Sequence, residues 1–190
     1  MPKQNIRQLM LAKRRALPDI MGRSASRLVQ QRFIATEVFA AAKVIALYAA
    51  VHNEVETGDA LHAALDAAKV VLFPAVSPEG LVFRRVGHAL ELRQGTFGIP
   101  EPDAACTVCS PEGADLIVIP GIAFDLYGRR IGYGKGYYDK ALHRLEGKGK
   151  LIAFCYDFQV VDEIVGEPHD VRMDMLITET RVIHPRGLII

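Results

Sequence analysis

The sequence predicts an α/β fold in which a mainly parallel sheet is covered by helices on both faces. Short runs of apolar and β-branched residues recur along the chain, and amphipathic helical patterns stand between them. This alternation is typical of parallel sheets, whose strands are buried on both sides. Polar clusters also follow several of the strand-like runs, as happens where a sheet carries a ligand site. Because the chain has 190 residues, of which 50% are hydrophobic and 24% charged, we expect one globular domain over residues 1–190.

Two amphipathic helices are expected at the start of the chain. The first covers residues 4–17 and ends before Pro18, because proline cannot continue a helix. Its apolar face consists of Ile6, Leu9, Met10 and Leu17. The second is expected over residues 23–41, where the apolar stripe consists of Leu28, Phe33, Ile34 and Val38.

Six short apolar runs are expected to form the strands of the sheet. They cover residues 44–50, 70–73, 81–86, 115–119, 151–156 and 175–178. The run at 81–86 is the most polar, so we expect it at an edge of the sheet. Further helices are expected over residues 57–68, capped by Thr57, and over residues 135–146. Residues 95–113 are rich in Pro, Gly and small side chains, which predicts a loop.

The most informative segment runs from Pro120 to Asp139, between the 115–119 strand and the 135–146 helix. It contains glycines at 132, 134 and 136 together with Arg129, Arg130 and Lys135. Glycine lets backbone N–H groups approach a ligand closely, and a helix N-terminus adds donors and a positive dipole end. The segment is therefore expected to bind an anionic, phosphorylated ligand. It has neither the P-loop nor the Rossmann spacing, and a plain glycine-rich turn remains the alternative.

Asp139 indicates which kind of anion is bound. A carboxylate beside a phosphate is repulsive unless a cation lies between them, and Mg²⁺ held by carboxylates and phosphate oxygens removes that conflict. The alternative is that Asp139 only favours the start of a helix, where an acidic side chain suits the dipole.

Three polar clusters follow three of the expected strands. They cover residues 52–56, 125–139 and 156–159. Because ligands lie beyond the carboxyl ends of parallel strands, we expect the three clusters to converge on one site.

Composition argues against several other classes of protein. The formal net charge is +1, so the chain as a whole gives no signal for binding a polyanion such as nucleic acid. No apolar run is long enough to span a membrane, and no apolar segment of the secretory type follows the basic N-terminus. Cys106, Cys109 and Cys155 are too few for a disulfide framework or for a zinc site built on the CxxC pair. We therefore expect a cytoplasmic protein.

With these motifs in view, the chain resembles the 5-formyltetrahydrofolate cyclo-ligase family, also called methenyltetrahydrofolate synthetases. The family pattern Pro-Gly-x-x-Phe-Asp, a short gap and Gly-x-Arg-x-Gly-x-Gly-x-Gly-Tyr-Tyr-Asp is matched from Pro120 to Asp139. Supporting matches follow the same order along nearly the whole chain, at Lys3 and Arg7, Tyr48 to Thr57, Phe73-Pro74, Gly98 to Pro102, and Asp170 to Glu179. The resemblance implies a three-layer α/β/α fold similar to that of NagB, RpiA and the CoA-transferases.

The resemblance implies an enzyme that uses ATP and Mg²⁺ to convert 5-formyltetrahydrofolate to 5,10-methenyltetrahydrofolate, releasing ADP and phosphate. ATP phosphorylates the formyl oxygen to an iminium phosphate, and N10 then displaces the phosphate. Positioning and charge neutralisation supply most of the rate in phosphoryl transfer. The implied partners are these small molecules, with neither nucleic acid nor a membrane, and the chain is expected to be a monomer or a weak homodimer.

The resemblance also assigns residues to the two substrates and to the metal. Lys135 and Arg130 are the implied catalytic residues, and Lys135 contacts the transferred phosphoryl group. The implied ATP-binding residues are Lys3, Gln4, Asn5, Ile6 and Arg7 and the run Arg130, Ile131, Gly132, Tyr133, Gly134, Lys135, Gly136, Tyr137 and Tyr138. The implied folate-binding residues are Ala49, Glu54, Tyr133, Gly134, Lys135, Gly136 and Tyr137. Asp139 and Asp170 are the implied Mg²⁺ ligands.

Several features leave alternatives open. Lys3 and Arg7 lie on one helical face and can both point at a triphosphate, but with the basic run 13–15 they also fit a solvated face. Tyr133 replaces an arginine of some relatives, so one folate or phosphate contact is expected to be lost, and Ala49 is smaller than the aliphatic residue often found there. The histidines that match no motif are expected to be exposed, namely His52, His143 and His169. The rival functions are a sugar-phosphate isomerase or CoA-transferase-like enzyme and a non-catalytic nucleotide-binding regulator.

Overall fold

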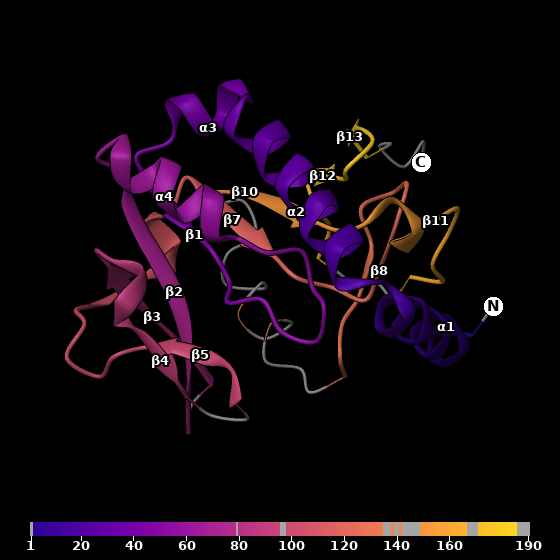
Figure 1. The fold of residues 1–190 in the computed structure, drawn as a ribbon, viewed down its shortest axis with the longest axis horizontal. Coiled ribbons are helices and arrows are strands. Elements are labelled where there is room, and N and C mark those ends of the chain that lie inside the picture. Colours follow the sequence, from indigo (N-terminus) through magenta and orange to yellow (C-terminus); the bar gives the residue numbers. More distant parts are fainter. Residues whose placement is uncertain are drawn as a thin grey trace.

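A large, mainly parallel sheet forms the centre of the computed structural model, which describes residues 2–78, 80–95, 98–134, 138, 141, 149–166 and 171–185. Within these residues the sheet has eight strands in the order β13-β12-β10-β7-β1-β2-β3-β6 (Figure 1). The parallel centre consists of β12 (Met175–Ile177), β10 (Lys150–Phe154), β7 (Leu116–Ile119), β1 (Val44–Ala46) and β2 (Val70–Ser77). The antiparallel strands beside it are β13 (Val182–Ile183), β3 (Gly80–Val86) and β6 (Val108–Cys109). The predicted α/β class with a mainly parallel sheet is confirmed.

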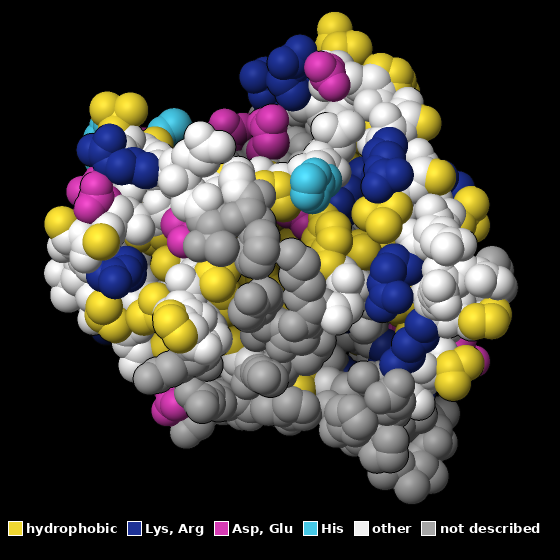
Figure 2. Space-filling model, turned by 90° about the horizontal axis from the view of Figure 1, so that it is seen from below, with side chains coloured by type: hydrophobic (Ala, Val, Ile, Leu, Met, Phe, Trp, Pro, Cys, Tyr) yellow, Lys and Arg dark blue, Asp and Glu magenta, His cyan; other side chains and the backbone are white. Residues whose placement is uncertain are grey.

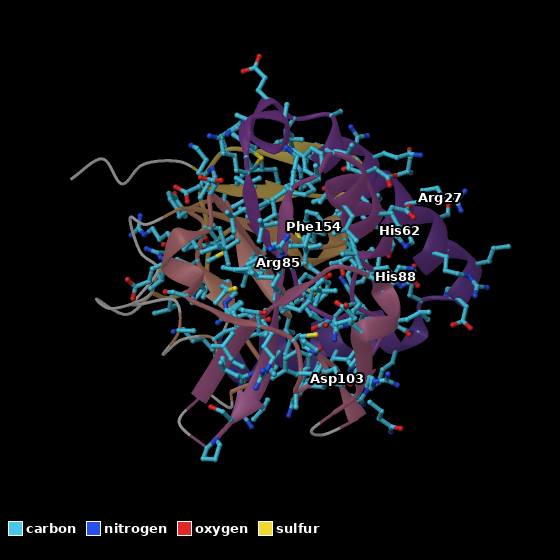
Figure 3. All side chains as sticks on the ribbon, turned by 90° about the vertical axis from the view of Figure 1, so that its left-hand side faces the viewer. Arg27, His62, Arg85, His88, Asp103 and Phe154 are labelled. Carbon is cyan, nitrogen blue, oxygen red and sulfur yellow. The ribbon has the colours of Figure 1, made fainter. Side chains whose placement is uncertain are left out.

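Helices α2 (Asp19–Ile34), α3 (Glu37–Ala41) and α4 (Gly58–Asp66) lie together over one face of this sheet (Figure 1). Successive strand residues point to opposite faces, and in β10 both sets are buried. Phe154 faces the helices and meets Phe33 of α2 edge-on, at a centroid distance of 5.1 Å, and Figure 3 shows it in the interior. Leu151 and Ala153 face the other side. This two-sided burial explains why the strands are apolar throughout.

The second face of the sheet is covered by Phe124, Val171 and Met173, and by Tyr138. Tyr138 and Ala141 are helical. They are the described positions of the helix predicted over residues 135–146, and the rest of that helix lies outside the described residues.

Helix α1 (Lys3–Ala16) lies apart from the other helices, beside a small second sheet (Figure 1). This sheet consists of β11 (Val160–Val161), β8 (Ala123–Asp125) and β9 (Arg130–Ile131). Ile6 and Met10 of α1 pack against Ile122 and Ile131, which buries the contact. Because β8 and β9 belong to the glycine-rich segment, this packing fixes α1 against the start of that segment.

A further two-stranded ribbon and three short 3₁₀ turns complete the described structure. The ribbon consists of β4 (Leu92–Gln94) and β5 (Pro100–Pro102). The turns are η1 (Ala89–Glu91), η3 (Pro111–Gly113) and η4 (Asp157–Gln159). Residues 95–113, predicted as a loop, therefore contain β5 and β6, and that prediction is wrong in part. The described helices include none that could cross a membrane.

Three other predictions about the elements are wrong in detail. The helix expected over 23–41 begins at Asp19 and is interrupted at Thr36, whose Oγ1 accepts a hydrogen bond from Phe39 N and starts α3. Thr57 does not cap α4 with its side chain, because its hydroxyl donates to the carbonyl of Tyr48 at 2.7 Å. The 81–86 strand is not at the edge, since β6 pairs with its outer side.

Candidate active site

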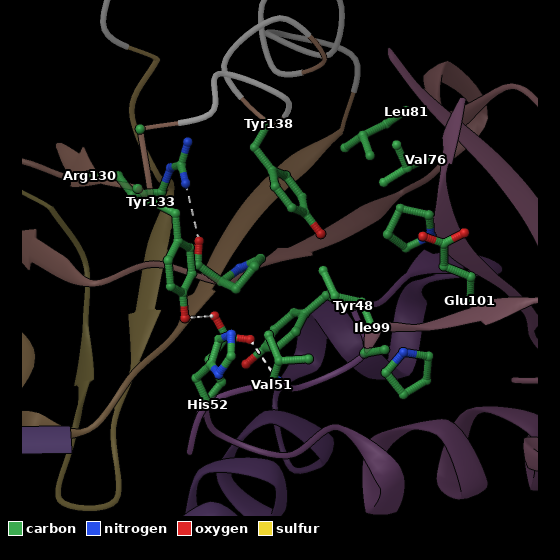
Figure 4. A pocket seen from close by; sticks show the side chains of 17 residues that line it. Tyr48, Val51, His52, Val76, Leu81, Ile99, Glu101, Arg130, Tyr133 and Tyr138 are labelled. Atoms are coloured by element: carbon green, nitrogen blue, oxygen red, sulfur yellow. Dashed lines mark hydrogen bonds between the residues drawn. The ribbon is translucent and has the colours of Figure 1, made fainter. Parts of the chain in front are cut away.

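A pocket of about 220 Å³ opens at the carboxyl ends of β1, β7 and β2. The chain runs from β1 to β2 on one side of the sheet and from β7 to β10 on the other, so the strand order reverses between β1 and β7. Open α/β sheets bind ligands at such switch points. Figure 2 shows hydrophobic side chains in the middle of this face, while Lys and Arg side chains follow one another along the side where α1 lies. The residues that line the pocket are Tyr48, Ala49, Val51, His52, Glu54, Pro74, Val76, Leu81, Ile99, Pro100, Glu101, Pro120, Arg130, Gly132, Tyr133, Gly134 and Tyr138 (Figure 4).

The segment after β1 turns sharply and presents Glu54 to the pocket. His52 and Asn53 have φ angles of 51° and 57°, in the left-handed region that short polar side chains tolerate in turns. Glu54 N donates to the carbonyl of Val51 at 3.0 Å and closes the turn. The buried Tyr48 hydroxyl donates to the carbonyl of Val55 at 2.6 Å, which ties the end of the turn to its start. His52 is exposed, as predicted, but it lines the pocket.

Glu54 is a buried carboxylate with several partners. Its Oε1 accepts a hydrogen bond from the Tyr133 hydroxyl at 2.8 Å, and its Oε2 accepts one from Val51 N at 3.1 Å. The Nη1 atom of Arg14 lies 3.9 Å from Oε1. Burial raises the pKa of Glu54 above its ordinary value, and the Arg14 charge and these two hydrogen bonds oppose the rise. Burial and the charge of Glu54 in turn raise the pKa of Tyr133.

Arg14 belongs to this cluster, although no sequence motif assigns it a role. It was grouped with a solvated basic face, and for Arg14 that interpretation is wrong, because the side chain is 1% exposed. Its guanidinium donates to the Tyr133 hydroxyl, to the carbonyl of His52 at 2.9 Å and to that of Gly121 at 3.3 Å. Arg14 stands seven residues after Arg7 and eleven after Lys3, which places all three on one helical face. This spacing is the feature of the sequence that could have indicated that Arg14 faces the site.

The glycine-rich segment begins as the hairpin of β8 and β9, which was not predicted. Asp125, counted among the polar residues of the site, is fully buried and structural: it accepts from Tyr127 N, Arg129 N and Ile164 N at 2.9 Å each. Gly128 closes the hairpin with a φ of 82°, and a Cβ there would lie 2.6 Å from the carbonyl oxygen of Met173.

The part of this segment after β9 contacts α1 and enters the pocket. Arg7 Nε donates to the carbonyl of Gly132 at 3.0 Å, so the helix that carries Lys3 and Arg7 lies against the glycines. Arg130 Nη1 donates to the carbonyl of Pro120 at 3.3 Å, and its guanidinium carbon lies 5.8 Å from the centre of the Tyr138 ring. The segment thereby presents backbone groups and a cation to one end of the pocket.

Two of the three predicted polar clusters meet at the pocket, and the third does not. The 52–56 cluster and the part of the 125–139 cluster that is described line the pocket together. The 156–159 cluster lies behind this wall: the Tyr156 hydroxyl is 3.5 Å from the carbonyl of Glu54, and Gln159 Nε2 donates to the carbonyls of Gly121 and Ile122. It supports the pocket rather than lining it.

An apolar wall faces the polar cluster, and its residues were not predicted to belong to the site. It is formed by Pro74 and Val76 of β2, Leu81 of β3, Pro100 of β5 and Ile99 just before β5. Glu101 lies in the same wall, across the pocket from Tyr133 in Figure 4. Its Oε1 is shielded from water and has no hydrogen-bond partner among the described residues. Such an oxygen has an unused capacity to accept a hydrogen bond.

The remaining residues implied by the resemblance fall into two groups. Gln4 and Asn5 are exposed on α1, whereas the side chains of Ile6 and Ile131 pack together in the small apolar cluster. Lys135, Gly136, Tyr137, Asp139 and Asp170 lie outside the described residues. Within the described part of the chain, no three His, Cys, Asp or Glu side chains gather as a metal site would require.

The shape and chemistry of the pocket suit a flat heterocycle. Ligand sites are mostly apolar and carry a few polar groups that fix orientation. Here Pro and aliphatic side chains form one wall, and tyrosines and two carboxylates supply the polar contacts. The carboxylates accept N–H donors, while the backbone of residues 132–134 and the basic face of α1 suit an anion at the other end.

Comparison with known proteins agrees with this geometry. The model of the 5-formyltetrahydrofolate cyclo-ligase family matches residues 1–179. Relatives with that name from Mycolicibacterium smegmatis and Mus musculus are each 28% identical, and the alignments cover 95% and 93%, respectively, of both chains. The solved 5,10-methenyltetrahydrofolate synthetase of Aquifex aeolicus has a TM-score of 0.88 at 34% identity, covering 98% of this chain and 94% of its own. That of Mycoplasma pneumoniae has a TM-score of 0.77 at 26% identity, covering 94% and 99%. The chain therefore belongs to the 5-formyltetrahydrofolate cyclo-ligase family.

Proposed function

We propose that this enzyme closes 5-formyltetrahydrofolate to 5,10-methenyltetrahydrofolate at the expense of ATP, with Mg²⁺ bound to the triphosphate. The observation that carries the proposal is the pocket at the switch point between β1 and β7, where the buried Glu54 meets the glycine-rich segment in a chain of this family. The apolar wall and the carboxylates fit a reduced pterin, and the glycines and cations fit a triphosphate.

The chemistry requires activation of a poor electrophile. The γ-phosphoryl group passes from ATP to the formyl oxygen, which gives ADP and an iminium phosphate. N10 of the folate then attacks the formyl carbon, the C–O bond breaks, phosphate leaves with the former formyl oxygen, and N10 loses its proton. The protein contributes positioning and electrostatic stabilisation rather than covalent chemistry.

In this proposal the two substrates meet at residues 130–138. Folate lies in the pocket against Glu54, Ala49 and Tyr133, so that its formyl group points toward the glycines. ATP lies along the first turn of α1, which contains Lys3, Gln4, Asn5, Ile6 and Arg7, and Lys3 and Arg7 share the face that points at it. Arg130 and Lys135 lie near the transferred group. The contact between Arg7 and Gly132 supports this arrangement, because it already joins the two parts of the nucleotide site. Asp139 and Asp170 would hold Mg²⁺, which would neutralise charge on the triphosphate.

One assay tests the proposed function. Purified protein is supplied with 5-formyltetrahydrofolate, with and without MgATP, and methenyltetrahydrofolate absorbance and ADP are both followed. We expect equal amounts of the two products, and neither without MgATP. ADP binding or ATP binding without product would indicate a nucleotide-binding regulator, and turnover of a sugar phosphate or CoA ester without ATP would indicate the isomerase-like or transferase-like alternative.

Replacing Glu101 by Gln is expected to raise the KM for 5-formyltetrahydrofolate by about tenfold, because a charged acceptor is exchanged for a neutral one. The melting temperature should not fall, since the Oε1 atom has no described partner to lose. Steady-state kinetics and thermal unfolding measure the two effects. Glu112→Gln changes an exposed carboxylate on η3 and serves as the control. An unchanged KM would show that Glu101 does not contact folate, and a lower melting temperature would show that its carboxylate is structural.

A further inference from the structure

Arg14 joins three walls of the pocket from within the protein. It belongs to α1, it donates to the carbonyl of His52 in the segment after β1, and it donates to the carbonyl of Gly121 after β7. Its neighbours Lys13 and Arg15 are exposed, whereas Arg14 is 1% exposed. A cation this deeply buried loses its hydration, and a buried ion pair recovers that loss only in part. Stability alone is therefore a weak reason for an arginine at this position.

The guanidinium of Arg14 lies where it acts on both Glu54 and Tyr133. The Nη1 atom is 3.9 Å from Glu54 Oε1, the Nη2 atom donates to the Tyr133 hydroxyl, and that hydroxyl donates to the same Oε1 at 2.8 Å. The three groups form a closed triangle at one end of the pocket. Arg14 has only donors and the carboxylate has only acceptors. The Tyr133 hydroxyl must therefore accept from Arg14 and donate to Glu54.

We infer that Arg14, acting with Tyr133, is a positioning residue that holds Glu54 in its charged form and aims it at folate. Tyr133 stands where some relatives have arginine, and the sequence predicts that one contact is lost for this reason. Here a guanidinium comes from α1 instead, and the Cζ atom of Arg14 lies 5.5 Å from the centre of the Tyr133 ring. The inference rests on the proposed function, and it concerns how the folate end of the site is kept competent.

The charge on Glu54 depends on every group that faces it. From α1 it meets Arg14, and from the segment after β9 it meets Tyr133. From the segment after β1 it meets Val51 N, while Tyr48 and Tyr138 are close enough for the Glu54 charge to raise their own pKa values. Among the described groups that act on the pKa of Glu54, Arg14 is the only cation, so removing it leaves burial with weaker opposition.

The test measures the dissociation constant of 5-formyltetrahydrofolate by calorimetry as pH is varied. In Arg14→Met the pKa of Glu54 should rise further, so the carboxyl takes up a proton at a pH where the wild-type group is still charged. We expect Kd to increase by about tenfold or more near neutral pH and to recover as pH is raised. Arg14→Lys, which keeps the charge, should recover part of the affinity, and Arg15→Met is the exposed control.

A double variant keeps the test decisive if Arg14→Met folds poorly. Arg14→Met with Glu54→Gln removes both charges, which restores a neutral interior. If Arg14 acts through Glu54, the double variant and Glu54→Gln bind folate equally, within about twofold. A further tenfold loss in the double variant would mean that Arg14 contacts folate itself. A loss in Arg14→Met that does not change with pH would mean a purely structural role, and either result overturns the inference. Wild-type protein that binds folate but forms no product would instead refute the proposed function.

Discussion

Glu54→Gln is expected to raise the KM for 5-formyltetrahydrofolate by about ten- to a hundredfold while kcat falls much less. The carboxylate is an ionised, doubly accepting group, and a hydrogen bond to a charged partner contributes about 1.5–3 kcal/mol. Glutamine keeps the shape but loses the charge and turns one acceptor into a donor, which faces the N–H donors of the pterin. Steady-state kinetics at saturating MgATP separate the two constants.

The matched control is Glu56→Gln, because Glu56 is an exposed carboxylate two residues away. Its KM for folate should stay within about twofold of wild type. Should Glu54→Gln leave the folate KM unchanged and weaken ATP binding instead, the two substrates would have been assigned to the wrong ends of the site.

Glu54→Gln should also change how the stability of the protein depends on pH. The ordinary pKa of a glutamate, about 4.5, applies to the unfolded chain, and burial raises the pKa of Glu54 above it in the folded chain. At pH values between the unfolded and the folded pKa, the folded chain therefore binds more protons than the unfolded chain. The free energy of unfolding therefore falls as pH rises through this interval. Glu54→Gln cannot titrate, so the melting temperature of wild type relative to the variant should decline as pH increases from about 4.5. If the melting temperature of wild type minus that of the variant stays constant or rises with pH, the pKa of Glu54 is not raised by burial.

The fold could be predicted from the sequence where burial alone decides the structure. The five parallel strands are apolar on both faces, and the predicted runs at 115–119 and 175–178 each agree with β7 and β12 within one residue at either end. Local hydrogen bonds were harder to foresee. Thr36 interrupts a continuous apolar stripe by capping α3, and Thr57 gives its hydroxyl to the Tyr48 carbonyl instead of to its own helix.

Some residues of the candidate site could likewise be predicted from the sequence, and others could not. The glycine-rich segment and the 52–56 cluster were identified because such residue types at the ends of strands indicate a ligand site. Glu54 itself was assigned through the resemblance to the family. Arg14 was missed because a basic residue in a basic helix is normally solvated. Here the segments that follow β1, β7 and β9 bury it, through contacts with His52, Gly121 and Tyr133. Asp125 was overvalued for the opposite reason. Its carboxylate accepts hydrogen bonds from two backbone N–H groups of the hairpin and from Ile164 N, and this arrangement cannot be foreseen without the fold.

Lys135→Ala is expected to lower kcat by about a hundred- to a thousandfold, with the KM for folate changed by less than about threefold. A cation aimed at the transferring phosphoryl group stabilises charge that exists mainly in the transition state, so its loss is felt in kcat. Lys135 lies outside the described residues, and the role is proposed from its place between the glycines at 134 and 136. Single-turnover ADP formation measures the step directly.

Two variants make the interpretation of Lys135 specific. Lys150→Ala removes an exposed lysine at the start of β10 and should leave kcat within about twofold of wild type. Arg7→Ala breaks the hydrogen bond from α1 to the carbonyl of Gly132, so it should raise the KM for ATP, because both parts of the proposed nucleotide site move apart. If Lys135→Ala also acted only on the KM for ATP, the lysine would bind the ground-state triphosphate without favouring the transition state, and its assignment as a catalytic residue would be withdrawn.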